Sequence, residues 1–342
     1  MNFFQSMRPS KTARQYFLGT ASVLASSLLL NMAGQVSAMA QATPYPTKSI
    51  TMIVPFPPGG LADIVARPVA EAMSRELGQS VIIENKGGAG GGIGMGVAAR
   101  SKPDGYTVLL ALSSLTVIPE ADALLGRNPM FLLNELRPIA RYTADPTVLA
   151  VRADAPWKTV KEFVEDARKR PGAINYGSSG NYGTMHVPME MLKVNEKFYM
   201  VHIPYTGAGP AIVALLGGQV DAVATGPSSV VQYIKAGKLR PLAHWGNARL
   251  VSLPDVPSFK EMGVPIEFAQ WSGLFVPSNT PDAIVNKLRE AAKLAANDEK
   301  VKEIIGNSGS PVMYLDAPEF KTYWDKDAGE LAISVKKIGK VE

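Results

Sequence analysis

The sequence contains no cysteine, which excludes disulfide bonds and thiolate chemistry without identifying the compartment in which the protein works. It has only three histidines, His186, His202 and His244, and their positions show no metal-binding spacing. Neither a G-x-S-x-G nucleophile elbow nor a G-x-x-x-x-G-K-S/T phosphate loop is present, and no acidic residues pair as an acid and a base. We therefore expect no catalysis, no metal and no cofactor.

The first 40 residues have the features of a removable secretion signal. Three cations lie between residues 8 and 14, an uncharged apolar run extends over 16–32, and Ala38-Met39-Ala40 presents small residues to a signal peptidase. We expect export and cleavage after Ala40. A membrane anchor is the alternative, but the run is short for a span of about 20 residues. No later segment is apolar enough to cross a bilayer, so we expect no stable membrane insertion after cleavage.

Removing the leader changes the charge argument. The full chain has 35 basic and 30 acidic residues, or +5, and three of the cations belong to the leader. The remaining 32 basic and 30 acidic residues leave +2 and form no basic stripe, so we expect no nucleic-acid partner. A length of 342 residues is too great for one ordinary core and suits two lobes.

Short β-rich runs alternate with helical runs after the leader. Strands are expected over 49–54, 80–84 and 106–111, with a helix after each of the first two. This βαβαβ order predicts an α/β protein with a mostly parallel sheet flanked by helices.

The pattern restarts after Asp145-Pro146, repeats until about Trp245, and then returns with a strand and two helices. We predict a signal peptide over 1–40, one lobe made of 41–145 plus 247–342, and a second lobe over 146–246. The two chain crossings would form a hinge. A continuous split into two domains is the alternative.

Four polar turns between a strand and a helix are the candidate binding features. They lie at 57–63, 176–184, 205–209 and 225–228. In open α/β sheets, ligands bind at the carboxyl ends of strands, and helix N-termini favour anions. Asp63 is expected to cap its helix rather than contact the ligand, and His186 to pack or hydrogen bond rather than act as a base.

The glycine-rich segment 87–96 invites a nucleotide-binding interpretation. The strict G-x-G-x-x-G spacing is absent, and only Gly94-Met95-Gly96-Val97-Ala98-Ala99 fits a relaxed form. We interpret the segment as a flexible loop that allows close packing of a helix against the sheet.

Several motifs in order resemble the solute-binding receptors of tripartite tricarboxylate transporters, often called Bug receptors. The resemblance extends from about Tyr45 to the C-terminus and rests on V54PFPPGG with Asp63, L77GQ, V81IIENK, G87GAGG, P103DGYT, Y176GSSG with His186, L216GGQVD, L253PDVP and W271SGL. It implies a two-lobed periplasmic-binding-protein (Venus flytrap) fold, a periplasmic location, a small carboxylate ligand and membrane permease subunits as partners. It also implies that Pro58–Asp63 and Ser178–Thr184 hold a carboxylate.

Three departures from the family pattern bear on the ligand. Ala62 stands where relatives often have a hydroxyl residue, and Thr206 stands where many have a cation, so a tricarboxylate is disfavoured. Tyr182 replaces a common glycine, which suggests an aromatic wall; the alternative is that it packs against the following helix. The predicted ligand-binding residues are Pro58, Gly59, Gly60, Leu61, Ala62, Asp63, Ser113, Ser178, Ser179, Gly180, Asn181, Tyr182, Gly183, Thr184, His186, Thr206, Gly207, Ala208, Thr225 and Ser228.

The sequence thus predicts a monomeric periplasmic receptor that captures a small carboxylate, with an aromatic one among the candidates, and delivers it to a transporter. Two alternatives remain open. One is a periplasmic hydrolase or lyase on the same scaffold, and the other is a ligand sensor that docks on a signalling partner.

Overall fold

The computed structural model describes residues 45–341, so the expected leader and its cleavage site lie outside the described residues. From Pro46 onward the chain forms one compact unit that contains two sheets. None of the helices within residues 45–341 combines the length and apolar character that a membrane span requires.

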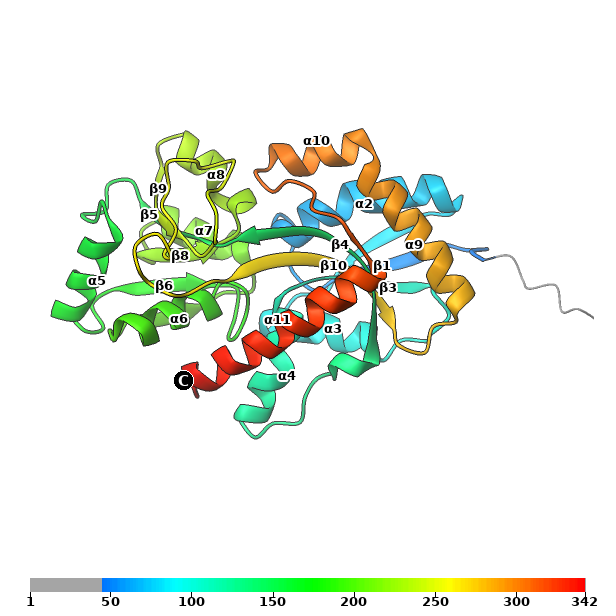
Figure 1. The fold of residues 1–342 in the computed structure, drawn as a ribbon, viewed down its shortest axis with the longest axis horizontal. Helices are drawn as coiled ribbons and strands as arrows, with labels where there is room; N and C mark the ends of the chain where they lie inside the picture. The colour runs from blue at the N-terminus through cyan, green and yellow to red at the C-terminus, as the bar shows by residue number, and fades with distance from the viewer. Residues whose placement is uncertain (1–44, 342) are drawn as a thin grey trace, which may run out of the picture. The chain divides into compact units, whose positions relative to one another are not determined.

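Sheet A has six strands in the order β11-β4-β10-β3-β1-β2 (Figure 1). Its strands are β1 (Ile50–Val54), β2 (Val81–Asn85), β3 (Thr107–Leu112), β4 (Leu136–Pro146), β10 (Ala269–Pro277) and β11 (Leu315–Asp316). The helices that alternate with these strands along the chain are α2 (Leu61–Leu77), α3 (Gly92–Ala99), α4 (Ser114–Leu124), α9 (Asp282–Asn297), α10 (Glu299–Asn307) and α11 (Ala317–Ile338).

Sheet B has five strands in the order β7-β6-β8-β5-β9. Its strands are β5 (Val148–Arg152), β6 (Asn175–Ser178), β7 (Val201–Pro204), β8 (Ala222–Thr225) and β9 (Leu239–His244). Its helices are α5 (Val160–Lys169), α6 (Val187–Glu196), α7 (Ala208–Leu216) and α8 (Pro227–Lys235).

The expected α/β architecture with two sheets is confirmed, but each sheet is mixed rather than mostly parallel. Parallel pairing joins β1 to β2 and β3, and β6 to β7 and β8. β10 is antiparallel to β3 and β4, and β5 is antiparallel to β8 and β9. The reason is that the chain leaves sheet A on β4 and returns on β10, and strands that leave and return side by side must run in opposite directions (Figure 1).

Sheet A contains strands from both before and after the segment that forms sheet B. This arrangement matches the expectation that the C-terminal part completes the first lobe. The residue boundaries proposed for the two lobes stay predictions. β4 and β10 are in register where they approach sheet B, with Asp145 opposite Gln270.

Helix α2 illustrates how local sequence sets the element bounds. It ends at Gly78, whose left-handed conformation (φ 65°) suits glycine. Pro68 lies inside the helix and is buried, yet α2 is continuous from Leu61 to Leu77. At α5, Thr159 and Glu162 form the capping box that a sequence of this type favours.

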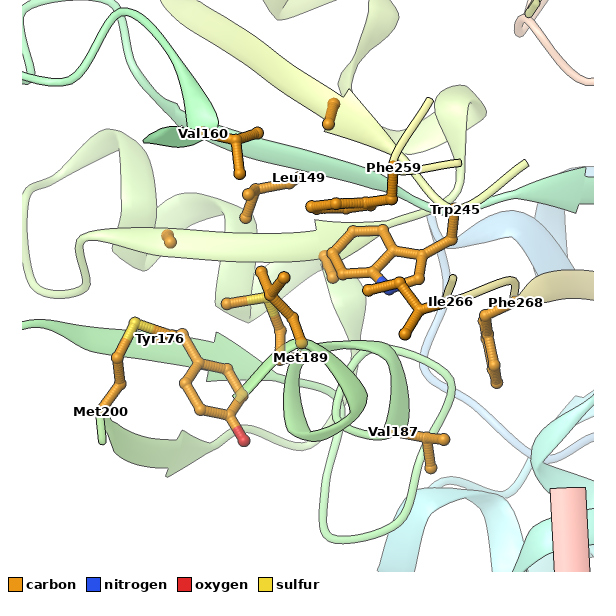
Figure 2. Close-up of a cluster of buried hydrophobic side chains, with 14 of the residues drawn as sticks. Leu149, Val160, Tyr176, Val187, Met189, Met200, Trp245, Phe259, Ile266 and Phe268 are labelled. Carbon is orange, nitrogen blue, oxygen red and sulfur yellow. The ribbon is translucent and has the colours of Figure 1, made fainter. Parts of the chain in front are cut away.

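An apolar core covers one face of sheet B and extends to α4 and α11. Figure 2 shows the rings of Trp245 and Phe259 next to each other. Their centroids are 4.5 Å apart. Leu331 of α11 and Val117 of α4 belong to the same buried cluster as these two rings. Helix α11 packs against both α4 and α6, so it links helices on the two sides of the fold.

Candidate functional site

Four helices begin in turns that follow strand ends, two after strands of sheet A and two after strands of sheet B. They are α2 after β1, α4 after β3, α7 after β7 and α8 after β8. In none of these four helices does the N-cap side chain accept a hydrogen bond from the helix. The first N–H groups of a helix lack intrahelical acceptors, and the helix dipole makes that end electropositive. Such turns offer donors to an anion.

The turns before α2 and α7, the end of β3, β10 and the turn between β6 and α6 (residues 176–184, called the second turn) enclose a small space, the inner chamber. It is lined by Phe56, Pro57, Gly60, Leu61, Ala62, Leu112, Ser179, Thr184, Ala208 and Gln270, none of them charged. The start of α2 lies close to the start of α7, since a Cβ atom built on Gly60 would lie 3.8 Å from Cβ of Ala208. The space is about 20 Å³, which is roughly what one water molecule requires.

Among the described residues, five buried side-chain oxygens in or beside the chamber have no hydrogen-bond partner in the protein. Two belong to the lining, one follows Leu112 and two flank Gly226-Pro227: Ser179 Oγ, Gln270 Oε1, Ser113 Oγ, Thr225 Oγ1 and Ser228 Oγ. A buried polar group left unpaired costs about 1–3 kcal/mol, so native proteins keep few of them without a reason. Eight other buried polar atoms of residues 45–341 also lack a partner, so their number alone does not identify a site. Ser179 Oγ and Gln270 Oε1 differ in that they line the chamber, where a bound ligand would supply the missing partners.

Asp63 shapes the first turn from behind the chamber. Its carboxylate accepts the Gly59 N–H at 3.0 Å, the Nε of Arg67 at 2.8 Å and the Nδ2 of Asn85 at 3.3 Å. Gly59 has φ 90°, a left-handed conformation that favours glycine and is held by this bond. With its oxygens engaged, Asp63 has the capping role expected from the sequence and does not line the chamber.

Two histidines hold the second turn. Ser178 Oγ lies 2.6 Å from Nε2 of His202 and accepts the Gly180 N–H at 3.1 Å. The Tyr182 N–H donates to Nδ1 of His186 at 2.9 Å. Burial lowers the pKa of His202 to about 4. It lowers the pKa of His186 well below its usual value, with smaller contributions from His202 and Lys193. Both rings are therefore neutral at pH 7.

Tyr182 packs rather than presenting a free aromatic face. Its ring meets the His186 ring edge-on, with centroids 5.5 Å apart. Its hydroxyl donates to the Gly339 carbonyl at 2.9 Å and accepts the Val341 N–H at 3.1 Å. The side chain is 3% exposed. These contacts favour the packing alternative over the aromatic wall.

Glycine contacts close the chamber on one side. A Cβ atom built on Gly180 would lie 2.8 Å from the Gly90 nitrogen, and one on Gly207 would lie 2.8 Å from Cδ of Pro57. The glycine-rich segment thus has two uses. Gly90 meets the second turn, whereas Gly94 permits close packing, since a Cβ there would lie 2.8 Å from the Pro55 Cα. The second use confirms the interpretation made from the sequence.

Beyond these contacts lies a larger outer cavity of about 560 Å³. It is lined by Gly88, Ala89, Ile118, Ala121, Asp122, Leu125, Arg127, Met130, Gly180, Asn181, Tyr182, Pro204, Tyr205 and Thr206. Apolar side chains dominate the part contributed by α4. Thr206 belongs to this cavity and not to the inner chamber.

The structure divides the predicted site residues into three groups. Those in the chamber lining are Gly60, Leu61, Ala62, Ser179, Thr184 and Ala208, with Ser113, Thr225 and Ser228 buried beside it. Those in the outer cavity are Gly180, Asn181, Tyr182 and Thr206. Those in neither lining are Pro58 and Gly59, which are exposed, and Asp63, Ser178, Gly183, His186 and Gly207, which support the turns.

Four residues of the chamber lining were not predicted from the sequence: Phe56, Pro57, Leu112 and Gln270. Gln270 lies in β10 and donates from Nε2 to Thr184 Oγ1 at 2.8 Å. No local signal marks it, since β10 also contains the polar residue Ser272.

Residues 65–339 match the family described as the tripartite tricarboxylate transporter family receptor. BugT of Bordetella pertussis is 33% identical over 277 residues, which cover 80% of this chain and 84% of that protein. The solved structure of periplasmic binding protein BugD is 32% identical, covers 86% of this chain and 99% of its own, and superposes with a TM-score of 0.80.

Two other solved structures hold ligands. MatC from Rhodopseudomonas palustris, with bound malate, is 28% identical over 85% of this chain and 99% of its own, with a TM-score of 0.79. Rpa4515 of the same organism, with adipate, is 26% identical over 86% and 99%, with a TM-score of 0.80. The family and the two-lobed fold predicted from the sequence are confirmed. This chain belongs to the receptor family of the tripartite tricarboxylate transporters, whose members are periplasmic solute-binding proteins.

Proposed function

We propose that the protein binds a small organic carboxylate between the turns that line the inner chamber and delivers it to the membrane subunits of a transporter. Because the chamber holds about 20 Å³, these turns must move apart to admit the ligand. The observation that carries this proposal is the group of five unpaired buried oxygens beside four uncapped helix starts. Helix N–H groups and hydroxyls suit a carboxylate without any cation. The malate and adipate in MatC and Rpa4515 support the same ligand class.

The ligand carries one or two carboxylates and not three. Within residues 45–341, no cation lines the chamber, and Thr206, where many relatives have a cation, lies in the outer cavity, whose lining contains a single cation, Arg127. A further buried charge without a partner would be costly. The outer cavity, with Ile118 and Met130 in its lining, suits an apolar body or a second carboxylate near the solvent. Because Tyr182 packs into the fold, it offers no free face for an aromatic ring of the ligand.

We further propose that the chain is exported, loses its leader near Ala40 and acts as a monomer. The apolar run and the small residues before Gln41 support export. Transport rather than signalling is the role that the family description favours.

An enzyme is the second candidate, because Ser178 and His202 form a serine–histidine pair. Three observations favour a structural role for this pair. Ser178 is fully buried, its hydroxyl accepts the Gly180 N–H, and it does not line the chamber. With a pKa of about 4, His202 is also a weak base at pH 7.

A thermal-shift screen, followed by calorimetry, tests the proposal. The probes are succinate, malate, aspartate, adipate, phthalate and citrate. A ligand that binds only the native state adds about 2.7 kcal/mol of stability at 100 times its Kd. We expect stabilisation by at least one mono- or dicarboxylate and little by citrate. Stabilisation by none of them would refute the proposal, and turnover of a bound acid, followed by NMR, would favour the enzyme.

A further inference from the structure

Gln270 differs chemically from the other unpaired groups of the chamber. Its amide nitrogen is already used, because Nε2 donates to Thr184 Oγ1 at 2.8 Å. Its oxygen, Oε1, is buried and has no partner in the protein. An amide oxygen can only accept a hydrogen bond, whereas serine and threonine hydroxyls can donate or accept. Gln270 is therefore the one residue among the five that requires a donor.

The surroundings hold this amide in place. β10 fixes the backbone of Gln270 opposite Asp145 of β4, and the side chain is 3% exposed. Thr184 holds the nitrogen, and Gly226 approaches the oxygen so closely that a Cβ built there would lie 2.6 Å from Oε1. An acceptor held in this way favours a ligand that places a donor beside it.

We propose that Gln270 is a specificity-determining residue that selects carboxylates bearing a hydroxyl or ammonium group over plain carboxylates. This inference rests on the function proposed above. An ionised carboxylate has acceptors only, and its oxygens suit the helix N–H groups and the hydroxyls. A plain carboxylate leaves Oε1 unpaired, whereas a hydroxy or amino acid satisfies it. Sites built to bond a ligand donor discriminate strongly against analogues that lack it.

Three four-carbon dicarboxylates test the preference, because they differ only at one carbon. Succinate carries hydrogen there, L-malate a hydroxyl and L-aspartate an ammonium group. Calorimetry on the wild-type protein should show malate or aspartate binding at least ~10-fold more tightly than succinate. Comparing the affinities for malate and aspartate shows whether the site prefers a hydroxyl or an ammonium donor.

Two variants separate the role of Gln270 Oε1 in ligand preference from the role of Thr184 in holding the amide. Gln270→Met removes the acceptor at similar volume and should bring the three affinities to within about threefold of one another. Thr184→Val removes the Thr184 hydroxyl that receives Nε2 but retains Oε1. Because this bond holds the amide in place, its loss should reduce the preference for malate or aspartate over succinate, but by less than Gln270→Met does. If Gln270→Met does not fold, Gln270→Ala provides the same comparison.

The outcomes are distinct. Equal binding of succinate, malate and aspartate by the wild type would overturn the inference, as would a preference that persists in Gln270→Met. Equal binding is also expected if the Gln270 amide is turned by 180°, because its NH₂ group would then donate to a plain carboxylate. If none of the carboxylates in the earlier screen binds, the proposed function itself fails, and the inference fails with it.

Discussion

Replacing Gly180 by alanine should weaken ligand binding by interfering with closure. Gly180 has φ 116°, and the new Cβ would lie 2.8 Å from the Gly90 nitrogen and 3.3 Å from its Cα. Real Cβ atoms essentially never approach backbone this closely, so the two turns must move apart by several tenths of an ångström. Neither neighbour is a flexible side chain that could yield instead.

The cost has two parts. A left-handed conformation costs an alanine about 1–2 kcal/mol whether the lobes are open or closed, so this part lowers stability without changing affinity. The steric part applies only when Gly180 meets Gly90, and overpacking of this kind costs about 1–3 kcal/mol. The affinity for a ligand held by the closed state should therefore fall by ~5- to 150-fold.

Gly263→Ala is the matched control. Gly263 has φ 80° and no atom within 4 Å of a built Cβ, so it shares the backbone strain without the contact. Gly90→Ala tests the same contact from the other side, where the closest approach is 3.0 Å, to the Asn181 carbonyl. Calorimetry with the tightest acid from the screen gives the affinities, and urea unfolding gives the stabilities.

Small-angle scattering of the ligand-free variants provides a second measurement that does not depend on ligand contacts. Gly180→Ala should have a larger radius of gyration than Gly263→Ala, because its turns are held apart. If both variants bind alike and scatter alike, the contact between Gly180 and Gly90 does not control closure, and the reasoning is wrong.

Ser179→Ala removes one unpaired hydroxyl of the chamber and should weaken binding of the same acid by ~1–2 kcal/mol in calorimetry; wild-type affinity would contradict its role. Burial raises the pKa of Asp145 to about 7, so between about pH 4 and pH 7 the folded protein retains a proton that the unfolded chain has lost, and stability falls as the pH rises. Asp145→Asn should reduce this slope in urea unfolding and raise stability at pH 8 by up to roughly 4 kcal/mol; an unchanged slope would contradict the assignment. His202 acts in the opposite direction, because a pKa lowered to about 4 makes the folded state lose stability as the pH falls from about 6.5 to 4. His202→Gln, which can still bond Ser178, should lose less stability over that interval, and an equal loss would assign the acid sensitivity to other groups.

The turns were predictable because glycine, proline and serine mark the points at which strands end and helices begin. The expected starts of α2, α7 and α8 lie where the structure has them. The capping role of Asp63 followed from its distance to the glycine pair, since a carboxylate at the third helical position reaches back by one turn. Local chemistry of this kind needs no knowledge of the rest of the fold.

The remaining features depend on contacts between distant residues. Gln270 has no local signal, because the chamber around it is formed by turns that precede it by 86 residues at Thr184. Tyr182 suggests a ligand wall because it replaces a common glycine, and the packing that the structure shows instead has no local signal, since its partner Gly339 lies 157 residues away. The antiparallel pairing of β4 with β10 in sheet A arises because the chain leaves on one strand and returns on the other, and the sequence pattern did not predict β4.

The bond between Tyr182 and Gly339 also has a consequence for the order of assembly. Contacts between residues so far apart in sequence form late, because closing a long loop costs entropy before the contact stabilises anything. Sheet B can gather all five of its strands from residues 148–244, but the turn containing Tyr182 is complete only when Gly339 and Val341 have docked. A chain that emerges from its N-terminus would therefore acquire binding competence at the end of folding. During refolding, the recovery of ligand binding, measured by the fluorescence change that the ligand induces, should then lag behind the recovery of secondary structure.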